Sequence, residues 1–92
     1  MEQIRIKELT KINNSWRFQV TLGTDPDTTS HTVTLDQKYW QKLTAGKITP
    51  PNLITKSFIF LLERESKESI LPSFDLSLIS TYFPDFEQTI SR

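Results

Sequence analysis

His31 is the single histidine of this sequence, so it is the only imidazole available to act as a general base. A serine nucleophile needs such a base within hydrogen-bond reach of its hydroxyl. The neighbouring Ser30 would point to the opposite face of an extended strand, and no Gly-x-Ser-x-Gly turn presents another serine. Cysteine is absent, which excludes thiol nucleophiles, disulfides and thiolate zinc sites. We therefore expect no catalytic residue and interpret His31 as a partly exposed structural histidine.

Two groups of acidic residues are candidates for a metal site, and neither has the ligand pattern that such a site needs. The spacing of a calcium-binding loop occurs at Asp25, Asp27, Thr29 and Asp36. Ser30, however, stands where such a loop needs its turn glycine. The second group has no histidine companion and consists of Glu63, Glu65 and Glu68. Because neither of the two glycines opens a phosphate-binding pattern, we predict that the protein binds no metal and no cofactor.

The length and the charge balance describe one small domain. A chain of 92 residues seldom contains two hydrophobic cores, so we assign a single domain to residues 1–92. Eleven basic and eleven acidic residues give a formal net charge of zero, which provides no global attraction for nucleic acid or anionic lipid. The charges are nevertheless segregated, because residues 36–62 carry four lysines and one aspartate, whereas residues 63–92 carry three basic and six acidic groups. This segregation is typical of the mixed solvated faces of a soluble domain, and the alternative is contact between unlike surfaces of two copies.

Alternation of apolar and polar side chains predicts three strands in the first part of the chain. The alternating runs cover residues 3–9, 16–22 and 31–35. Turn residues at 13–15 and a polar loop at 23–30 separate them. Short connections between consecutive strands predict an antiparallel meander.

The hydrophobic period changes after the third run, where two helices are predicted. Asp36 is expected to cap a helix over 37–45, and Gly46 is expected to end it. Thr49 is expected to cap a longer helix over about 50–65, whose first turn accommodates two prolines.

Two further short helical segments are predicted near the C-terminus. Asp75 is expected to cap the first, which ends before Pro84. Its apolar stripe consists of Leu76, Ile79, Tyr82 and Phe83. A last turn places Phe86 and Ile90 on one side. The whole order predicts an α+β fold: an N-terminal three-stranded antiparallel meander followed by three or four short helices.

The helix predicted over 50–65 is apolar on two sides. At about 100° per residue, Leu53 and Phe60 fall far from the face that contains Phe58. Both sides need cover, either from the chain's own sheet and C-terminal segment or from a second chain. We predict a protein–protein interface at Leu53, Lys56 and Phe60. We accordingly interpret the chain as a small non-catalytic binding or regulatory protein, acting as a homodimer or on another protein partner.

An alternative comes from the middle of the chain. The run Ser30-His31-Thr32-Val33-Thr34-Leu35-Asp36 is followed by a predicted helix, Gly46, Thr49 and Leu53-Ile54-Thr55-Lys56-Ser57-Phe58. This order resembles a ribbon-helix-helix module, in which a strand pairs with the same strand of a second chain and enters the DNA major groove. The resemblance implies a transcriptional regulator or antitoxin-like repressor, with DNA contacts at Ser30, Thr32, Thr34, Lys38 and Lys42. The pairing partner of strand 31–35 distinguishes the two hypotheses.

A second resemblance covers the C-terminal half. The residues that carry it are Ser57-Phe58-Ile59-Phe60-Leu61-Leu62-Glu63-Arg64-Glu65, Ser69-Ile70-Leu71, Phe74-Asp75-Leu76, Ile79 and Tyr82-Phe83-Pro84. This pattern is similar to a family of short bacterial proteins of uncharacterised function, and it implies a shared fold without implying a chemistry.

The sequence also predicts a location in the cell. The longest apolar run, from Phe58 to Leu62, is much shorter than the roughly twenty residues of a membrane span. The residues before the first strand lack the apolar segment of a signal peptide. We therefore expect a cytoplasmic protein without a membrane segment.

Overall fold

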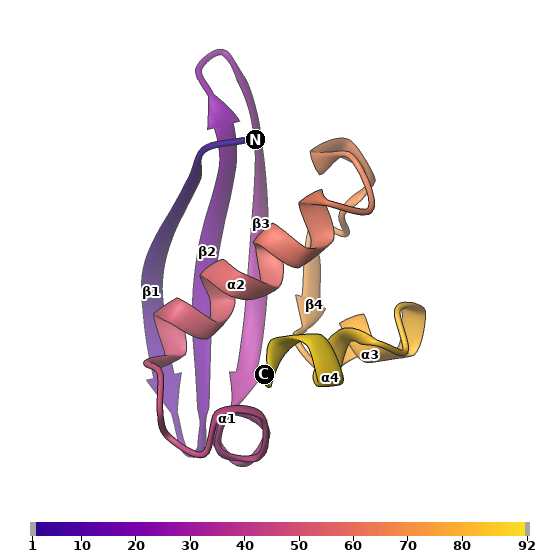
Figure 1. Cartoon of the computed structure of the whole chain (residues 1–92). Coiled ribbons are helices and arrows are strands. Elements are labelled where there is room, and N and C mark those ends of the chain that lie inside the picture. The colour runs from indigo at the N-terminus through magenta and orange to yellow at the C-terminus, as the bar shows by residue number, and fades with distance from the viewer. Residues whose placement is uncertain (1, 92) are drawn as a thin grey trace.

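A four-stranded sheet with helices on one side forms the fold. The structure is a computed structural model that describes residues 2–91 (Figure 1). The elements are β1 (Ile4–Ile12), β2 (Ser15–Thr24), β3 (Asp27–Asp36), α1 (Gln37–Thr44), α2 (Pro50–Leu62), the 3-10 helix η1 (Lys67–Ser69), β4 (Ser73–Asp75), α3 (Leu78–Tyr82) and α4 (Phe86–Ile90). The strand order is β1-β2-β3-β4, and the first three strands are antiparallel. The predicted α+β class, with an N-terminal meander followed by helices, is confirmed.

The β2–β3 hairpin is longer and tighter than predicted. Its register continues to the pair Thr24–Asp27, which leaves Asp25 and Pro26 as a two-residue tip. The prediction of a polar loop over residues 23–30 is therefore wrong. Threonines are common in that stretch, and their β-branched side chains suit an extended backbone once a partner strand satisfies its hydrogen bonds.

The short strand β4 is an element that the sequence analysis did not predict. Phe74 pairs in parallel register with Val33, and the Thr32 N–H donates to the Pro72 carbonyl at 2.8 Å. Three residues are too few to show alternation, and their partner lies far away in the chain. Since β3 is paired on both sides within its own chain, the two-chain ribbon expected from the ribbon-helix-helix resemblance has no free edge at residues 32–34.

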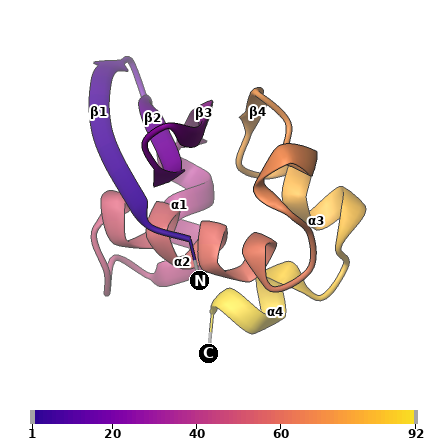
Figure 2. The ribbon, with the colours of Figure 1, turned by 90° about the horizontal axis from the view of Figure 1, so that it is seen from above.

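One face of the sheet forms the hydrophobic core. α2 runs across this face, and α1 and α4 lie on the same side of the sheet (Figures 1 and 2). The fully buried side chains of β2 and β3 are Phe18, Val20, Leu22, Val33 and Leu35. Ile54 and Phe58 of α2 are fully buried in the same core. The residues that alternate with the buried ones, such as Gln19 and Thr32, are polar and belong to the open face of the sheet.

The predicted caps of the first two helices are present. Asp36 caps α1 and Thr49 caps α2, each by accepting a hydrogen bond from a main-chain N–H of the first turn, at 3.2 and 3.3 Å. Ala45 and Gly46 both have positive φ angles, 53° and 74°, and end α1 in a left-handed conformation. α2 ends at Leu62 rather than near residue 65.

The C-terminal segment of the same chain covers the second apolar side of α2. Phe60 is 2% exposed, and its ring centroid lies 5.1 Å from that of Phe86 and 5.9 Å from that of Phe83. Leu53 is fully buried. The interface predicted at Leu53, Lys56 and Phe60 is therefore corrected: of these three residues, only Lys56 is exposed. The residues that bury Phe60 belong to the short helical segments on either side of Pro84. The sequence does not reveal the direction in which these segments pack.

The last two helices contain five residues each. Asp75 ends β4, and its carboxylate accepts a hydrogen bond from the Ser77 N–H at 3.1 Å, ahead of α3. Phe86 and Ile90 are buried in α4, which confirms the predicted last turn. None of the described helices has the length and apolar character needed to cross a bilayer.

Candidate functional site

His31 is fully engaged in holding the fold together. It is 3% exposed, so the expectation of a partly exposed histidine is corrected. Its Nδ1 lies 2.8 Å from the Leu71 carbonyl oxygen, and its Nε2 lies 2.8 Å from the Thr29 hydroxyl. Because a carbonyl oxygen only accepts, Nδ1 donates its proton to Leu71, while Nε2 shares a hydrogen bond with the Thr29 hydroxyl. His31 therefore fastens the segment before β4 to β3, in agreement with a structural role.

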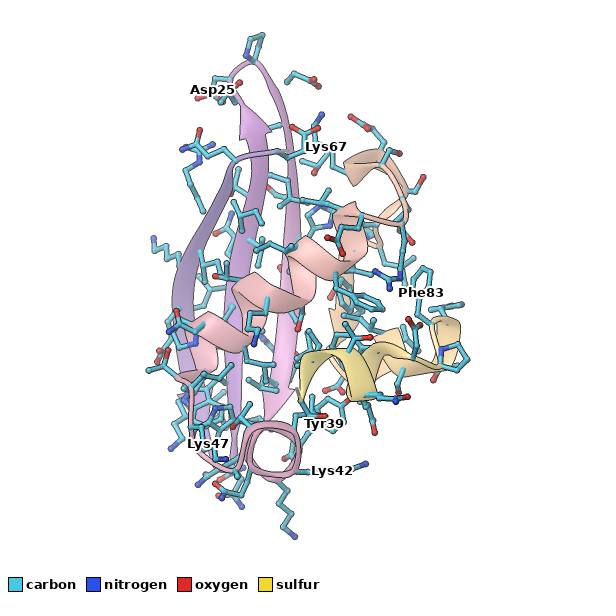
Figure 3. All side chains as sticks on the ribbon, viewed as in Figure 1. Asp25, Tyr39, Lys42, Lys47, Lys67 and Phe83 are labelled. Carbon is cyan, nitrogen blue, oxygen red and sulfur yellow. The ribbon has the colours of Figure 1, made fainter. Side chains whose placement is uncertain are left out.

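Lys67 is a buried lysine whose ammonium contacts three carboxylates. Its Nζ lies 3.0 Å from Glu68, 3.1 Å from Asp27 and 3.2 Å from Glu2. Figure 3 shows Lys67 near the end of the sheet that carries Asp25. The cluster connects three separate parts of the chain: the N-terminal segment, the start of β3 and η1.

The contacts within this cluster favour the charged forms of Lys67 and Glu68. Hydrogen bonds to Glu68 and Asp27 raise the pKa of Lys67, and the hydrogen bond from Lys67 lowers the pKa of Glu68. An amine that stays protonated is neither a nucleophile nor a Schiff-base former. Lys67 is thus an electrostatic tie between elements.

A second polar cluster joins α1 to α4. The Tyr39 hydroxyl donates to Glu87 Oε2 at 2.9 Å, and the Lys42 ammonium lies 3.3 Å from Glu87 Oε1. Burial raises the pKa of Tyr39, and the acceptor bond to Glu87 raises it further. Tyr39 therefore stays protonated and acts as a hydrogen-bond donor between the two helices. Figure 3 shows Tyr39 and Lys42 at α1.

An open cleft of about 290 Å³ lies between the end of α2, the segment before β4, and α3. We call it the α3 cleft. Its lining is mostly apolar and includes Leu61, Ile70, Leu71, Phe74, Ile79 and Phe83. Tyr82 also lines the cleft. Both Leu71 and Tyr82 are exposed and form its rim. Concave apolar surfaces with a few polar groups are where proteins usually bind ligands or partner side chains.

Glu65 is the carboxylate of the α3 cleft. It also lines a neighbouring polar hollow together with Glu2 and Lys67. Burial raises the pKa of Glu65 above its ordinary value of 4.5. Within residues 2–91, no cation lies within ion-pair distance of this carboxylate. A partly desolvated carboxylate of this kind is stabilised when a partner brings a positive charge.

The residues implied as DNA contacts lie on two different elements. Ser30, Thr32 and Thr34 belong to β3, on the open face of the sheet. Lys38 and Lys42 belong to α1, which begins where β3 ends. The Lys42 ammonium is already paired with Glu87. The structure thus gives these five residues no common pocket.

Three residues that matter at these sites, Lys67, Leu71 and Tyr82, have no distinguishing local pattern in the sequence. Lys67 lies in a run of alternating charges, which is typical of a solvated segment. Leu71 and Tyr82 look like core residues by their type, and Tyr82 fits the predicted stripe of the third helix. Tyr82 is exposed because α3 is short and ends at that residue. No local signal distinguishes such a residue from a buried one.

No protein-family model matches the chain, and neither a curated protein nor a solved structure matches it. Across residues 2–91, no three His, Asp or Glu side chains are grouped so as to hold a metal ion. The functional interpretation therefore depends on the geometry of the α3 cleft.

Proposed function

We propose that this chain is a small, non-catalytic, cytosolic binding or regulatory protein that acts through protein–protein contacts at the α3 cleft. The observation that carries the proposal is the pair of exposed apolar residues at the rim, Leu71 and Tyr82. Large apolar side chains that remain exposed beside an apolar hollow gain free energy when a partner covers them.

The shape of the cleft supports a protein partner over a small molecule. The hollow is open and small, and its rim residues extend to the protein surface. An occupant that fills only the hollow leaves Leu71 and Tyr82 partly in water. A protein segment inserts one apolar side chain and also covers the rim, and tyrosine is enriched at such interfaces because one end is apolar and the other is polar.

The polar groups around the cleft support binding over catalysis. Both ring nitrogens of His31 are occupied by hydrogen bonds, so the imidazole does not face the cleft as a free base. Ser69 lines the cleft together with Glu65, but its hydroxyl lies 3.2 Å from that of Ser66, and within residues 2–91 no hydrogen bond joins it to Glu65. Acid–base or nucleophilic catalysis needs at least two groups in matched positions.

Photo-crosslinking in the native cells tests this proposal. A benzophenone amino acid replaces Tyr82 at the rim, and a matched variant carries it at Lys56, the exposed position on α2. We expect crosslinks to protein from position 82 and none from position 56. Absence of a protein crosslink at position 82, or equal crosslinking at both positions, contradicts the proposal.

A further inference from the structure

Four large apolar side chains are exposed among the described residues, and they form two separate surfaces. Leu71 and Tyr82 belong to the rim of the α3 cleft, whereas Leu9 and Ile12 belong to β1; their exposed fractions lie between 43% and 64%. β1 is one edge of the sheet, and β4, beside the cleft, is the other edge (Figures 1 and 2). The two apolar surfaces therefore lie on opposite sides of the molecule.

Charged residues flank the exposed apolar residues of β1, with Glu8 before Leu9 and Lys11 before Ile12. Thr10 and Lys11 separate Leu9 from Ile12 along β1. Lys11 is in register with Trp16, and its ammonium lies 5.1 Å from the ring centroid of that residue. Arg17, on the neighbouring strand, is in register with Thr10. Within the described chain, neither Lys11 nor Arg17 forms an ion pair. We call Leu9, Lys11 and Ile12 the β1 patch, which is apolar and basic.

The α3 cleft has the opposite charge. Glu65 lines the cleft, and the adjoining hollow brings it close to the Lys67 cluster. The hollow and the Lys67 cluster together contain four carboxylates, Glu2, Asp27, Glu65 and Glu68, and the ammonium of Lys67. The net charge of these five groups is −3 (one minus four). Lys42 and Lys47 lie at the other end of the molecule (Figure 3). The carboxylates around Lys67 and these two lysines thus lie at opposite ends of the molecule.

We propose that the occupant of the α3 cleft is a second copy of this chain, which docks its β1 patch there. This inference rests on the proposed function of the cleft and names its partner. The apolar residues Leu9 and Ile12 match the apolar lining and rim. The ammonium of Lys11 matches the unpaired carboxylate of Glu65, so the apolar and the electrostatic complementarity coincide.

The contact joins unlike surfaces, so it is head-to-tail. A pair joined in this way keeps one free cleft and one free β1 patch, and assembly continues beyond two chains unless the geometry closes a ring. Symmetric pairing of two β1 edges is disfavoured for two reasons. Arg5, Lys7 and Lys11 would bring like charges together. The β1–β2 register also shifts between Glu8 and Thr10, and such an irregularity makes an edge strand a poorer partner for another strand.

Sedimentation of the purified full chain, with two double variants, tests this contact. Leu9→Ser/Ile12→Ser removes the β1 patch, and Leu71→Ser/Tyr82→Ser removes the rim of the cleft. All four side chains are exposed, and circular dichroism checks that both variants fold. We expect the mean mass of the wild type to rise with concentration and each variant alone to stay monomeric. An equimolar mixture keeps one intact patch and one intact cleft, so it should form a two-chain species and nothing larger.

Two outcomes overturn the inference. A wild type that stays monomeric up to its solubility limit contradicts self-association, while crosslinks to another protein from position 82 would still support the proposed function. A wild type that associates while the mixed variants stay monomeric shows that the contact lies elsewhere.

A pair of charge variants gives an independent readout that leaves the apolar residues intact. Lys11→Glu and Lys56→Glu change the net charge equally, but only the first removes the cation that faces Glu65. We expect Lys11→Glu to weaken self-association by about tenfold or more, and Lys56→Glu to leave it close to wild type. Added salt should weaken the wild-type contact. Equal effects of the two substitutions would contradict a specific pairing with Glu65.

Discussion

Nδ1 of His31 donates a hydrogen bond to the carbonyl oxygen of Leu71 over 2.8 Å. The two residues lie far apart in the chain, and the bond fixes the segment that leads into β4. Leu71 is also a rim residue of the α3 cleft. The one histidine of the chain therefore shapes the proposed binding surface without taking part in chemistry.

Replacement of His31 should destabilise the protein through this bond. His31→Leu keeps an apolar side chain in the core but removes the donor to Leu71, and we expect a loss of about 1–3 kcal/mol in the free energy of unfolding. His31→Asn retains an N–H donor near the position of Nδ1 and should lose less. Urea unfolding measures both changes. Equal stability of wild type and His31→Leu would show that the hydrogen bond contributes nothing.

The Lys67 cluster should give the protein an acid-sensitive part of its stability. The hydrogen bond from Lys67 holds the pKa of Glu68 below its ordinary value of 4.5, so this stabilisation is present above pH 4.5 and is lost as the pH falls through the lowered value. The raised pKa of Lys67 keeps the ammonium charged through neutral and mildly alkaline pH.

Thermal unfolding of Lys67→Met against pH measures this contribution. The substitution leaves three carboxylates without their cation, so we expect a lower melting temperature near neutral pH. The difference from wild type should shrink as these carboxylates become protonated. Lys47→Met, at an exposed position, is the matched control. A melting-temperature difference that does not change with pH would contradict this account of the cluster.

Truncation of Phe60 should show that α2 is covered within the chain. Phe60 lies under Phe83 and Phe86, and the guanidinium carbon of Arg64 lies 3.5 Å from its ring centroid. Phe60→Ala should cost about 3–5 kcal/mol, as expected for a large buried aromatic residue. Lys56→Ala, on the same helix, should change stability by less than about 0.5 kcal/mol. A small effect of Phe60→Ala on a monomeric sample would mean that the aromatic contacts are loose.

The strands, the two first helices and their caps could be predicted because their signals are local. Alternation defines β1 to β3, and Asp36 and Thr49 occupy cap positions at the expected distance from the apolar stripes. The hairpin at 23–30 could not be predicted, because the polar residues there become strand only when a partner satisfies their backbone. β4 depends in the same way on its pairing with β3.

The candidate site was not predictable for a related reason. Phe60 and Tyr82 are both large aromatic residues at helical spacing, yet one is 2% and the other 64% exposed. The difference arises from where α3 ends and where α4 packs, and both are tertiary facts. Lys67 is similar, since its three carboxylates come from positions that only the fold brings together.

The central claim is that the α3 cleft and the β1 patch are the two halves of one contact. Backbone amide NMR spectra recorded over a dilution series test it most directly, because they report every surface at once. We predict concentration-dependent shifts at residues 9–12 and around Leu71 and Tyr82, with one common dissociation constant. Amides of the open sheet face, such as Gln19 and Thr32, should stay unchanged. Spectra that do not change with concentration, or shifts confined to β1 or to the open face, would contradict the claim.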